Sequence, residues 1–219
     1  MSTGGHSDRR WRALAACGAC VLGFAAVAIT LRSRPGRLDA AVLDWLVEHR
    51  AGWLTTVARV VTNVGSPTGM VVLAVVLTFV GVKRAVPRPW LPIVVAAIAD
   101  VTQSQLKPVF GRDRPPIGTR LISEASFAFP SGHAAMAMTV LGMAAVLAPS
   151  LLGHPRARGI QVALVTAALC VGASRLYLGV HWLSDVVGGV LLGGAFAALF
   201  AVLVAPSTPA EPVRQAPCE

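Results

Sequence analysis

The chain has 219 residues, of which 55% are hydrophobic and only 13% are charged, and its mean hydropathy is +0.67. Soluble domains carry about 25% charged residues, so this composition excludes an ordinary soluble domain and predicts an integral membrane protein. The net charge of +9 would favour a nucleic-acid partner in a soluble protein. In a membrane protein the same excess is typical of Lys and Arg at helix ends, and we expect no nucleic-acid partner.

Long apolar runs divide the chain and predict its helices. A spanning helix needs about 20 apolar residues. The second run is shorter, and it reaches this length only if residues 53–64 continue it across Gly65, Ser66 and Pro67. We therefore expect an all-α, polytopic membrane protein built as a six-transmembrane-helix bundle. The six runs are residues 13–31, 69–82, 90–109, 134–152, 160–178 and 182–205.

The two ends of the chain differ from this apolar body. We expect residues 1–12 to be a cytoplasmic N-terminal tail, 13–206 to be one membrane domain, and the Pro-rich residues 207–219 to be a disordered C-terminal tail. Three arginines precede the first run, and an Ala-Val-Ala sequence lies near its end, which is also the arrangement of a cleaved secretory signal. An uncleaved first span is favoured in a chain with several spans.

Residues 38–50 predict a helix of another kind. The apolar positions recur with helical spacing, and a Trp among them suits the depth of a membrane interface. An amphipathic helix on the membrane surface and a surface helix packed on the bundle are both consistent with this pattern. The apolar positions are Leu38, Ala41, Val42, Trp45 and Leu46, and the acidic residues Asp39, Asp44 and Glu48 lie elsewhere around the helix.

The basic residues favour one orientation in the membrane. Six spans place both termini on one side and the loops after the third and fifth spans on the other. Most basic clusters then face the cytoplasm, as the positive-inside tendency requires, although residues 32–50 of the first outer loop carry four arginines. This orientation places three polar segments, residues 107–115, 130–133 and 174–185, on the outer face.

In the third polar segment, His181 and Asp185 lie four residues apart at the start of the last apolar run. Residues at this spacing share one face of a helix, so the carboxylate can accept the N–H of one ring nitrogen. That contact would fix the tautomer and leave the other nitrogen free as a nucleophile. The plainer interpretation is a histidine at a helix end with an incidental acidic neighbour, and the pair alone does not decide between the two.

The second polar segment precedes the helix expected from about Ala134. Ser131 suits the N-cap, so Gly132 and His133 would open the helix, where free backbone N–H groups favour an anion. Gly132 would let a ligand approach the backbone, and His133 would face that ligand and act as a general acid. A capped helix start with a histidine is common, so this segment alone is weak evidence.

Lys107, Arg114 and Arg175 complete a set of phosphate-binding residue types. One Arg side chain can donate two parallel hydrogen bonds to two phosphate oxygens, and Lys supplies a compact positive charge. Each of the three alone is typical of an interfacial anchor. Together, beside two histidines and an aspartate, they are harder to explain that way, because so much positive charge next to lipid needs an anionic partner.

Asp100 lies inside the third run, about two helical turns before Lys107 and roughly 10 Å deeper on the same face. Gln103 and Ser104 continue this polar stripe. An acidic residue within a membrane is a candidate for function, but an internal hydrogen-bonding role is favoured.

The joint spacing K-x6-R-P, P-S-G-H and S-R-x5-H-x3-D resembles the three-part motif of the type 2 phosphatidic acid phosphatase (PAP2) superfamily. Every motif position is present between Lys107 and Asp185, and the six-run layout is similar to that of the family's membrane members. The resemblance implies a lipid phosphatase that needs neither a metal nor another cofactor. It further implies a multi-pass protein of the bacterial plasma membrane with its active site on the extracytoplasmic face.

The resemblance also implies a role for each motif residue. His181 would attack phosphorus and form a phosphohistidine, and Asp185 would orient it. His133 would protonate the leaving oxygen and then help water to hydrolyse the intermediate. The cations would stabilise charge on the phosphate oxygens in place of a metal. The residues expected to hold the phosphate are Lys107, Arg114, Ser131, Gly132 and Arg175.

The substrate is predicted only by class. The family's bacterial membrane members suggest undecaprenyl diphosphate, which is recycled in cell-wall synthesis. Phosphatidate and phosphatidylglycerol phosphate are close alternatives. A lipid phosphotransferase, in which an alcohol captures the phosphohistidine instead of water, is the alternative from another reaction class.

Overall fold

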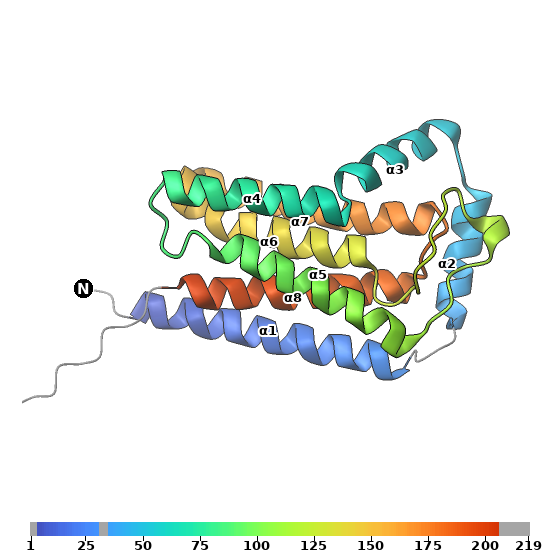
Figure 1. Cartoon of the computed structure of the whole chain (residues 1–219), viewed down its shortest axis with the longest axis horizontal. Coiled ribbons are helices and arrows are strands. Elements are labelled where there is room, and N and C mark those ends of the chain that lie inside the picture. Colours follow the sequence, from blue (N-terminus) through green and yellow to red (C-terminus); the bar gives the residue numbers. More distant parts are fainter. Residues whose placement is uncertain (1–3, 31–34, 206–219) are drawn as a thin grey trace, which may run out of the picture.

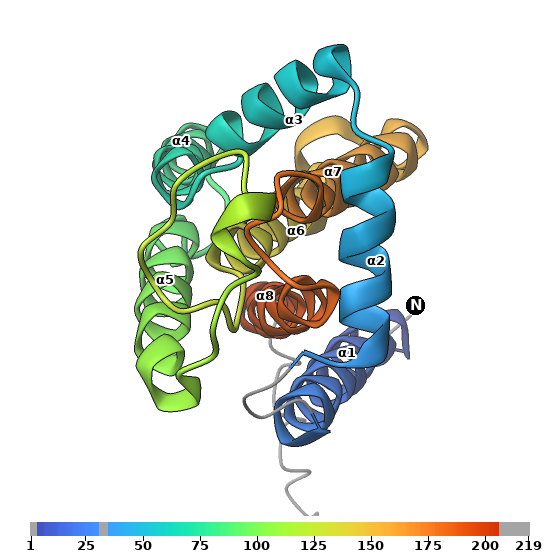
Figure 2. The same ribbon diagram turned by 90° about the vertical axis from the view of Figure 1, so that its right-hand side faces the viewer.

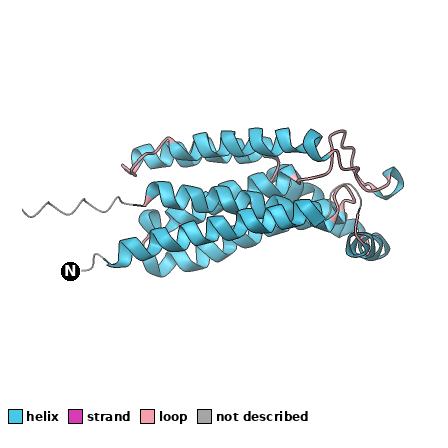
Figure 3. Ribbon diagram, turned by 90° about the horizontal axis from the view of Figure 1, so that it is seen from below, coloured by secondary structure: helices cyan, strands magenta, loops and turns pink. Residues whose placement is uncertain are grey.

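The computed structural model describes residues 4–30 and 35–205, and these residues form helices and loops without a strand (Figure 3). The predicted all-α class is therefore confirmed. In chain order the helices are α1 (Gly4–Thr30), α2 (Arg37–Glu48), α3 (Gly52–Val64), α4 (Pro67–Lys83), α5 (Leu91–Phe110), the short 3-10 helix η1 (Ile117–Thr119), α6 (Gly132–Leu152), α7 (His154–Tyr177) and α8 (Leu183–Val204).

The long helices α1, α4, α5, α6, α7 and α8 run side by side along the long axis of the molecule (Figure 1). Helix α6 lies in the middle and packs against α4, α5, α7 and α8 (Figure 2). Helix α2 lies across one end of this bundle, and α3 leads from it at an angle to α4. The same end carries the loop between α5 and α6 and the turn between α7 and α8.

The core forms around α6, whose residues are mostly buried, small or flexible apolar side chains. Glycine allows the neighbouring helix α8 to come close. A Cβ atom on Gly189 would lie 2.5 Å from the carbonyl oxygen of Ser131, and one on Gly142 would lie 2.6 Å from Cβ of Ala197. Packing through small residues is the usual way in which membrane helices associate. Here it holds the first turns of α6 and α8, which carry part of the site, side by side.

Four of the described helices are long and apolar enough to cross a membrane: residues 8–30 of α1, all of α6, residues 156–177 of α7, and all of α8. A fifth span results if α3 and α4 are counted together, although this pair is bent by 50°. The bend lies at the interruption seen in the sequence, where the Ser66 hydroxyl caps α4 by accepting from the N–H of Gly69 at 3.1 Å. Helix α5, the third predicted run, does not reach this hydropathy, so the count of six stays a prediction.

Helix α1 begins earlier than the apolar run, because it starts at Gly4 and so includes most of the predicted tail of residues 1–12. It packs along α8, and its Phe24 stacks on Phe129 with ring centroids 5.6 Å apart. Helix α1 is thus part of the bundle wall. The predicted C-terminal tail, residues 207–219, lies outside the described residues.

Helix α2 confirms the helix predicted for residues 38–50 but presents a different face to the bundle. Asp39, which the spacing placed away from the apolar side, is buried with 4% of its surface exposed, and Leu43 is buried beside it. Leu38 and Trp45 are exposed. The helix therefore packs on the bundle through one side and shows apolar side chains on another, which combines the two interpretations of the sequence.

Candidate active site

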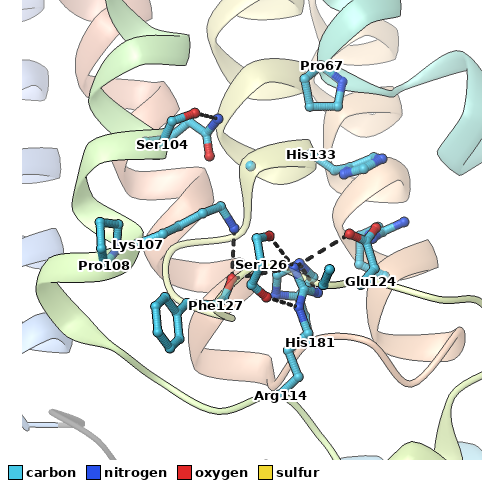
Figure 4. A pocket seen from close by; sticks show the side chains of 14 residues that line it. Pro67, Ser104, Lys107, Pro108, Arg114, Glu124, Ser126, Phe127, His133 and His181 are labelled. Atoms are coloured by element: carbon cyan, nitrogen blue, oxygen red, sulfur yellow. Dashed lines mark hydrogen bonds and ion pairs between the residues drawn. The ribbon is translucent and has the colours of Figure 1, made fainter.

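The three polar segments meet at the end of the bundle that α2 crosses, where a pocket of about 460 Å³ opens among them (Figure 4). Six of the eight predicted site residues line this pocket, so residues far apart in sequence converge on one space. They are Lys107 from the last turn of α5, Arg114 from the loop after it, Gly132 and His133 from the first turn of α6, Arg175 from the last turn of α7, and His181 from the turn before α8. Asp185 and Ser131 lie immediately behind them.

His181 is almost fully buried and lies between an acidic and a basic partner. Its Nδ1 atom is 3.4 Å from Oδ2 of Asp185, and its Nε2 atom is 3.2 Å from a guanidinium nitrogen of Arg114. A carboxylate only accepts hydrogen bonds, so the contact favours the tautomer with its proton on Nδ1. In this tautomer the lone pair of Nε2 accepts from the guanidinium of Arg114, which lines the pocket, so a bound phosphate would have to draw Arg114 away before Nε2 could attack phosphorus.

The contact between His181 and Asp185 does not arise as the sequence spacing predicted. Helix α8 begins at Leu183, so His181 lies outside the helix. Asp185 folds back over the helix start and accepts from the backbone N–H of Trp182 at 2.9 Å, as the acidic residue of a capping box does. The predicted pair is present, but a helix cap produces it rather than two side chains on one helix face.

The turn between α7 and α8 aims His181 at the pocket. Gly179 adopts a left-handed conformation with φ +70°, and a side chain there would collide with the carbonyl oxygen of Thr119. The next residue, Val180, donates its backbone N–H to the carbonyl of Arg175 at 3.2 Å. The chain therefore reverses tightly after α7 and brings His181 back beside Arg175.

Lys107 and Arg114 are held by backbone oxygens of the loop that borders the pocket. Lys107 donates to the carbonyl of Phe127 at 2.9 Å, and Nε of Arg114 donates to the carbonyl of Ser126 at 2.6 Å. These contacts orient the side chains without neutralising either positive charge. Burial lowers the pKa of Arg114 to about 10, which still leaves the guanidinium charged at neutral pH.

Arg175 is 1% exposed and is fixed by two side chains that the sequence did not indicate. Thr62 of α3 accepts from one terminal nitrogen at 2.8 Å, and Glu124 of the α5–α6 loop accepts from the other. Glu124 also lies 3.7 Å from a nitrogen of Arg114. Neither Thr62 nor Glu124 belongs to the motif spacing, and no local pattern marks them.

Glu124 thus places a carboxylate between the two arginines that were predicted to hold the phosphate (Figure 4). Partial burial alone would raise the pKa of Glu124, but the charges of Arg175 and Arg114 outweigh it and hold the pKa below its ordinary 4.5. The carboxylate is therefore ionised at neutral pH. A phosphate that enters the pocket would compete with it for the same donors.

The start of α6 supplies backbone donors at the pocket wall. Ser131 is the N-cap residue, as predicted, and its N–H donates to the carbonyl of Asp185 at 3.0 Å. Its buried hydroxyl makes no capping bond and has no partner among the described residues. A Cβ atom on Gly132 would lie 2.6 Å from Oε1 of Gln103, so α5 already excludes a larger residue there. The free N–H groups of this helix start favour an anion.

The polar stripe of α5 borders the same pocket. The side-chain amide of Gln103 donates to Asp100 at 3.0 Å and to Ser104 at 2.8 Å. Gln103 and Ser104 line the pocket, whereas Asp100 does not. This arrangement supports the hydrogen-bonding role that was favoured for Asp100.

A second charged cluster, made of Arg112, Asp39 and Asp185, lies on the other side of His181. One guanidinium nitrogen of Arg112 is 2.7 Å from Asp39 and another is 2.7 Å from Asp185. Sequence reasoning missed Arg112 because it falls in the unspecified part of the first motif, and it missed Asp39 because the helical pattern placed that residue elsewhere. The one available signal was a second arginine two residues before Arg114, which needs an acidic partner if it lies next to lipid.

The site as a whole suits a tetrahedral anion. Burial lowers the pKa of His181 well below its ordinary 6.5, and the charges of Arg114, Arg175 and Lys107 act in the same direction. The imidazole is therefore neutral at pH 7 and keeps a lone pair for attack. No group of three or more His, Cys, Asp or Glu that could hold a metal occurs in the part of the chain that the structure describes.

Comparisons with known proteins agree with this chemistry. The model of the PAP2 superfamily matches residues 88–209, which is more than half of the chain. Phosphatidylglycerophosphatase B of Bacillus subtilis strain 168 is 32% identical over 160 residues, covering 71% of this chain and 77% of that protein. Lipid A 1-phosphatase of Rhizobium etli is 36% identical over 109 residues, covering 46% of this chain and 43% of that protein.

Two solved structures share the fold. The crystal structure of a transmembrane PAP2-type phosphatidylglycerolphosphate phosphatase from Bacillus subtilis superposes with a TM-score of 0.74 at 26% sequence identity, covering 84% of this chain and 93% of that one. The crystal structure of Aquifex aeolicus LpxE superposes with a TM-score of 0.60 at 23% identity, covering 75% and 95%. The second likeness shows the fold alone.

Proposed function

The chain belongs to the PAP2 superfamily and is a membrane lipid phosphatase, and from this premise we propose that it cleaves a lipid phosphate through a phosphohistidine formed on His181. The observation that carries the proposal is the position of Nε2 of His181. This atom faces the pocket beside Arg114, while Asp185 holds the opposite ring nitrogen. His133 lines the same pocket, but among the described residues it is His181 whose opposite ring nitrogen has a carboxylate partner.

The first half of the reaction transfers the phosphoryl group to the protein. The Nε2 lone pair of His181 forms a bond to phosphorus, and the bond between phosphorus and the lipid oxygen breaks. The leaving oxygen takes a proton from His133, which lies in the pocket wall at the start of α6. Lys107, Arg114, Arg175 and the free N–H groups of α6 stabilise charge on the other three oxygens.

The second half returns the protein to its starting state. His133, now neutral, takes a proton from a water molecule as that water attacks phosphorus. The bond between phosphorus and Nε2 breaks, which restores neutral His181 and releases inorganic phosphate. Asp185 keeps the proton of His181 on Nδ1 throughout, so Nε2 is available again for the next cycle.

Phosphatidylglycerol phosphate is the substrate that the comparisons favour. The support is the 32% identity to a phosphatidylglycerophosphatase, together with the likeness to a solved phosphatidylglycerolphosphate phosphatase. Undecaprenyl diphosphate, which the sequence suggested first, is the competing substrate. Both end in a phosphate that the same cations can hold, and the lipid part distinguishes them.

A substrate panel on purified protein tests the proposal. Phosphate release is measured with phosphatidylglycerol phosphate, phosphatidate and undecaprenyl diphosphate, using wild type and the His181→Ala variant. We expect the highest kcat/KM with phosphatidylglycerol phosphate and release at background level in the variant. Full activity in the variant would overturn the phosphohistidine, and a preference for the diphosphate would overturn the substrate assignment.

Hydrolysis and phosphoryl transfer are separated by product analysis. The reaction is run with a competing alcohol, and the products are resolved as inorganic phosphate and alkyl phosphate. We expect inorganic phosphate, because the pocket is open and water reaches the intermediate. Alkyl phosphate as the main product would assign the phosphotransferase activity instead.

We also propose that the pocket opens on the extracytoplasmic face. The support is the distribution of charge along the bundle, because the basic residues in the N-terminal part of α1 and between α4 and α5 lie at the end opposite the pocket (Figure 1). A single cysteine introduced at exposed Ser123, with the natural cysteines replaced, should react with an impermeant reagent added outside whole cells. Labelling only after the cytoplasmic side is exposed would reverse the orientation.

A further inference from the structure

Arg112 is a fully enclosed charged residue behind the pocket. It is 0% exposed, and one of its terminal nitrogens donates to the Ser184 hydroxyl and to Oδ1 of Asp185, both at 2.7 Å. The other terminal nitrogen donates to Oδ2 of Asp39 at 2.7 Å. Arg112 does not line the pocket, so a bound phosphate would not touch it.

Asp39 is bound as tightly as Arg112. Its Oδ1 accepts from the backbone N–H of Ser184 at 2.9 Å, and its Oδ2 accepts from the Ser184 hydroxyl at 2.8 Å. Partial burial would raise the pKa of Asp39, but the hydrogen bonds from Ser184, Gly36 and Arg112 outweigh it and lower the pKa. Helix α2 is thus joined by an ionised carboxylate to the first turn of α8.

The two oxygens of Asp185 have different partners. Oδ2 receives the N–H of Trp182 at 2.9 Å and faces Nδ1 of His181 at 3.4 Å, whereas Oδ1 is taken by Arg112. Because Oδ1 is held, the carboxylate cannot rotate about its terminal bond without losing a charged hydrogen bond. The direction in which Oδ2 points, and therefore the tautomer of His181, depends on Arg112.

We propose that Arg112 and Asp39 are positioning residues of the phosphatase reaction: Arg112 fixes the carboxylate of Asp185 toward His181, and Asp39 fixes Arg112. The inference rests on the proposed role of His181 as nucleophile. It makes helix α2, which contributes nothing to the pocket lining, a necessary part of the catalytic machinery. Three buried charges would otherwise be a poor means of stabilising this end of the bundle, since buried ion pairs contribute little net stability.

The first test compares steady-state kinetics of Asp39→Asn and Arg112→Lys with wild type. Asn keeps the shape of Asp39 and removes its charge, and Lys keeps the charge of Arg112 but cannot reach both carboxylates. We expect kcat to fall about 10²-fold in each, as for a misplaced reacting group, with KM changed by less than about threefold. Asp44→Asn, on an exposed position of the same helix, is the matched control and should behave as wild type.

The second test uses the pH profile of kcat/KM, which a purely structural role would not shift. The charged and titratable groups facing His181 are Lys107 of α5, Arg114 and Glu124 of the loop, His133 of α6, Arg175 of α7 and Asp185 of α8. Removing the negative charge of Asp39 should move the acid limb to lower pH. Removing the positive charge in Arg112→Met should move it to higher pH.

The outcomes separate this inference from the function on which it rests. Wild-type activity in His181→Ala would contradict the role of His181 as nucleophile, and it would therefore overturn both the phosphohistidine mechanism and the positioning role. An inactive His181→Ala beside wild-type kcat in Asp39→Asn and Arg112→Lys would leave the phosphatase standing and overturn only the positioning role. If Arg112→Met does not fold, Asp39→Asn decides alone, and a lower melting temperature with unchanged kcat and an unshifted pH profile assigns Asp39 to stability.

Discussion

Two charged clusters flank His181, and they differ in sign and in space. The pocket cluster has three cations, Lys107, Arg114 and Arg175, with Glu124 as its one acid, and it surrounds about 460 Å³ of open space. The enclosed cluster has two acids, Asp39 and Asp185, for one cation, Arg112, and its side chains are almost completely buried. The pocket cluster therefore carries more positive than negative charge, and the enclosed cluster carries more negative than positive charge.

This difference explains how the imidazole of His181 can be neutral and also held in one orientation toward the pocket. The surplus of positive charge on the pocket side disfavours protonation of His181 and attracts the phosphate. On the enclosed side, the carboxylate of Asp185 accepts a hydrogen bond from Nδ1 and so fixes the orientation of the ring. A cluster with room and unmatched cations binds a ligand, whereas a cluster without room holds its neighbours in place.

The largest effect is expected from removing the residue between the two clusters. His181→Ala should lower kcat on the order of 10⁵-fold or more, because the nucleophile acts as one unit with its partners and leaves only binding and electrostatic contributions. Acid-labile phosphate on the protein, trapped by rapid denaturation during turnover, should vanish in the same variant. His49→Ala, an exposed histidine of α2's C-cap, is the control and should keep wild-type turnover.

A smaller effect is expected from changing one cation of the pocket cluster. Arg175→Lys keeps the charge but cannot contact Thr62 and a phosphate oxygen together, so kcat/KM should fall about 10²-fold. The measurement is phosphate release at several substrate concentrations, with Arg59→Lys on α3 as control. Activity within threefold of wild type would mean that charge alone, without the planar geometry of Arg, suffices at this position.

The sequence predicted the pocket cluster far better than the enclosed one, for a physical reason. Its positively charged and histidine residues lie at or just beyond helix ends, and the binding of one anion accounts for all of them. They are Lys107, Arg114, Arg175 and His181. Their convergence followed from the helix order alone. Glu124 and Thr62 make contacts across long separations in sequence, which no local spacing encodes.

The face of α2 shows the same limit. A helical pattern predicts which side is buried only when burial is driven by the removal of apolar surface from water. Next to a membrane that drive is weak, so Leu38 and Trp45 stay outward and a single buried ion pair from Asp39 to Arg112 decides the orientation. The count of six spans stays a prediction for a related reason: polar residues lower the hydropathy of α5, and the chain is bent between α3 and α4.

The pH dependence should report the charge difference between the clusters. Because the pKa of His181 lies well below 6.5, the histidine stays neutral, and kcat/KM should remain unchanged as pH falls from about 7.5 to 6.5. The unfolded chain takes up this proton near pH 6.5 and the folded chain does not, so the free energy of unfolding decreases as pH falls below 6.5. Half-maximal kcat/KM at or above pH 6.5 would contradict a buried, cation-flanked imidazole. The slope of melting temperature against pH should be shallower in His181→Gln.

The smallest effect, on binding alone, is expected from Glu124, the one acid of the pocket cluster. Glu124→Gln removes the charge that competes with phosphate for Arg175 and Arg114, so inorganic phosphate should inhibit the variant about threefold to tenfold more tightly. Product should then leave more slowly, and kcat should not rise. Ser123→Ala, at the neighbouring exposed position, is the control for the loop, and the measurement is the inhibition constant for phosphate at pH 7.5.

Because the pKa of Glu124 is held below 4.5, the difference between wild type and variant should persist down to about pH 5 and disappear only when the carboxylate is protonated. Equal inhibition constants at neutral pH would show that Glu124 moves away from the arginines before phosphate binds. In that case the wild-type pocket would present Arg114 and Arg175 to phosphate as fully as the variant does.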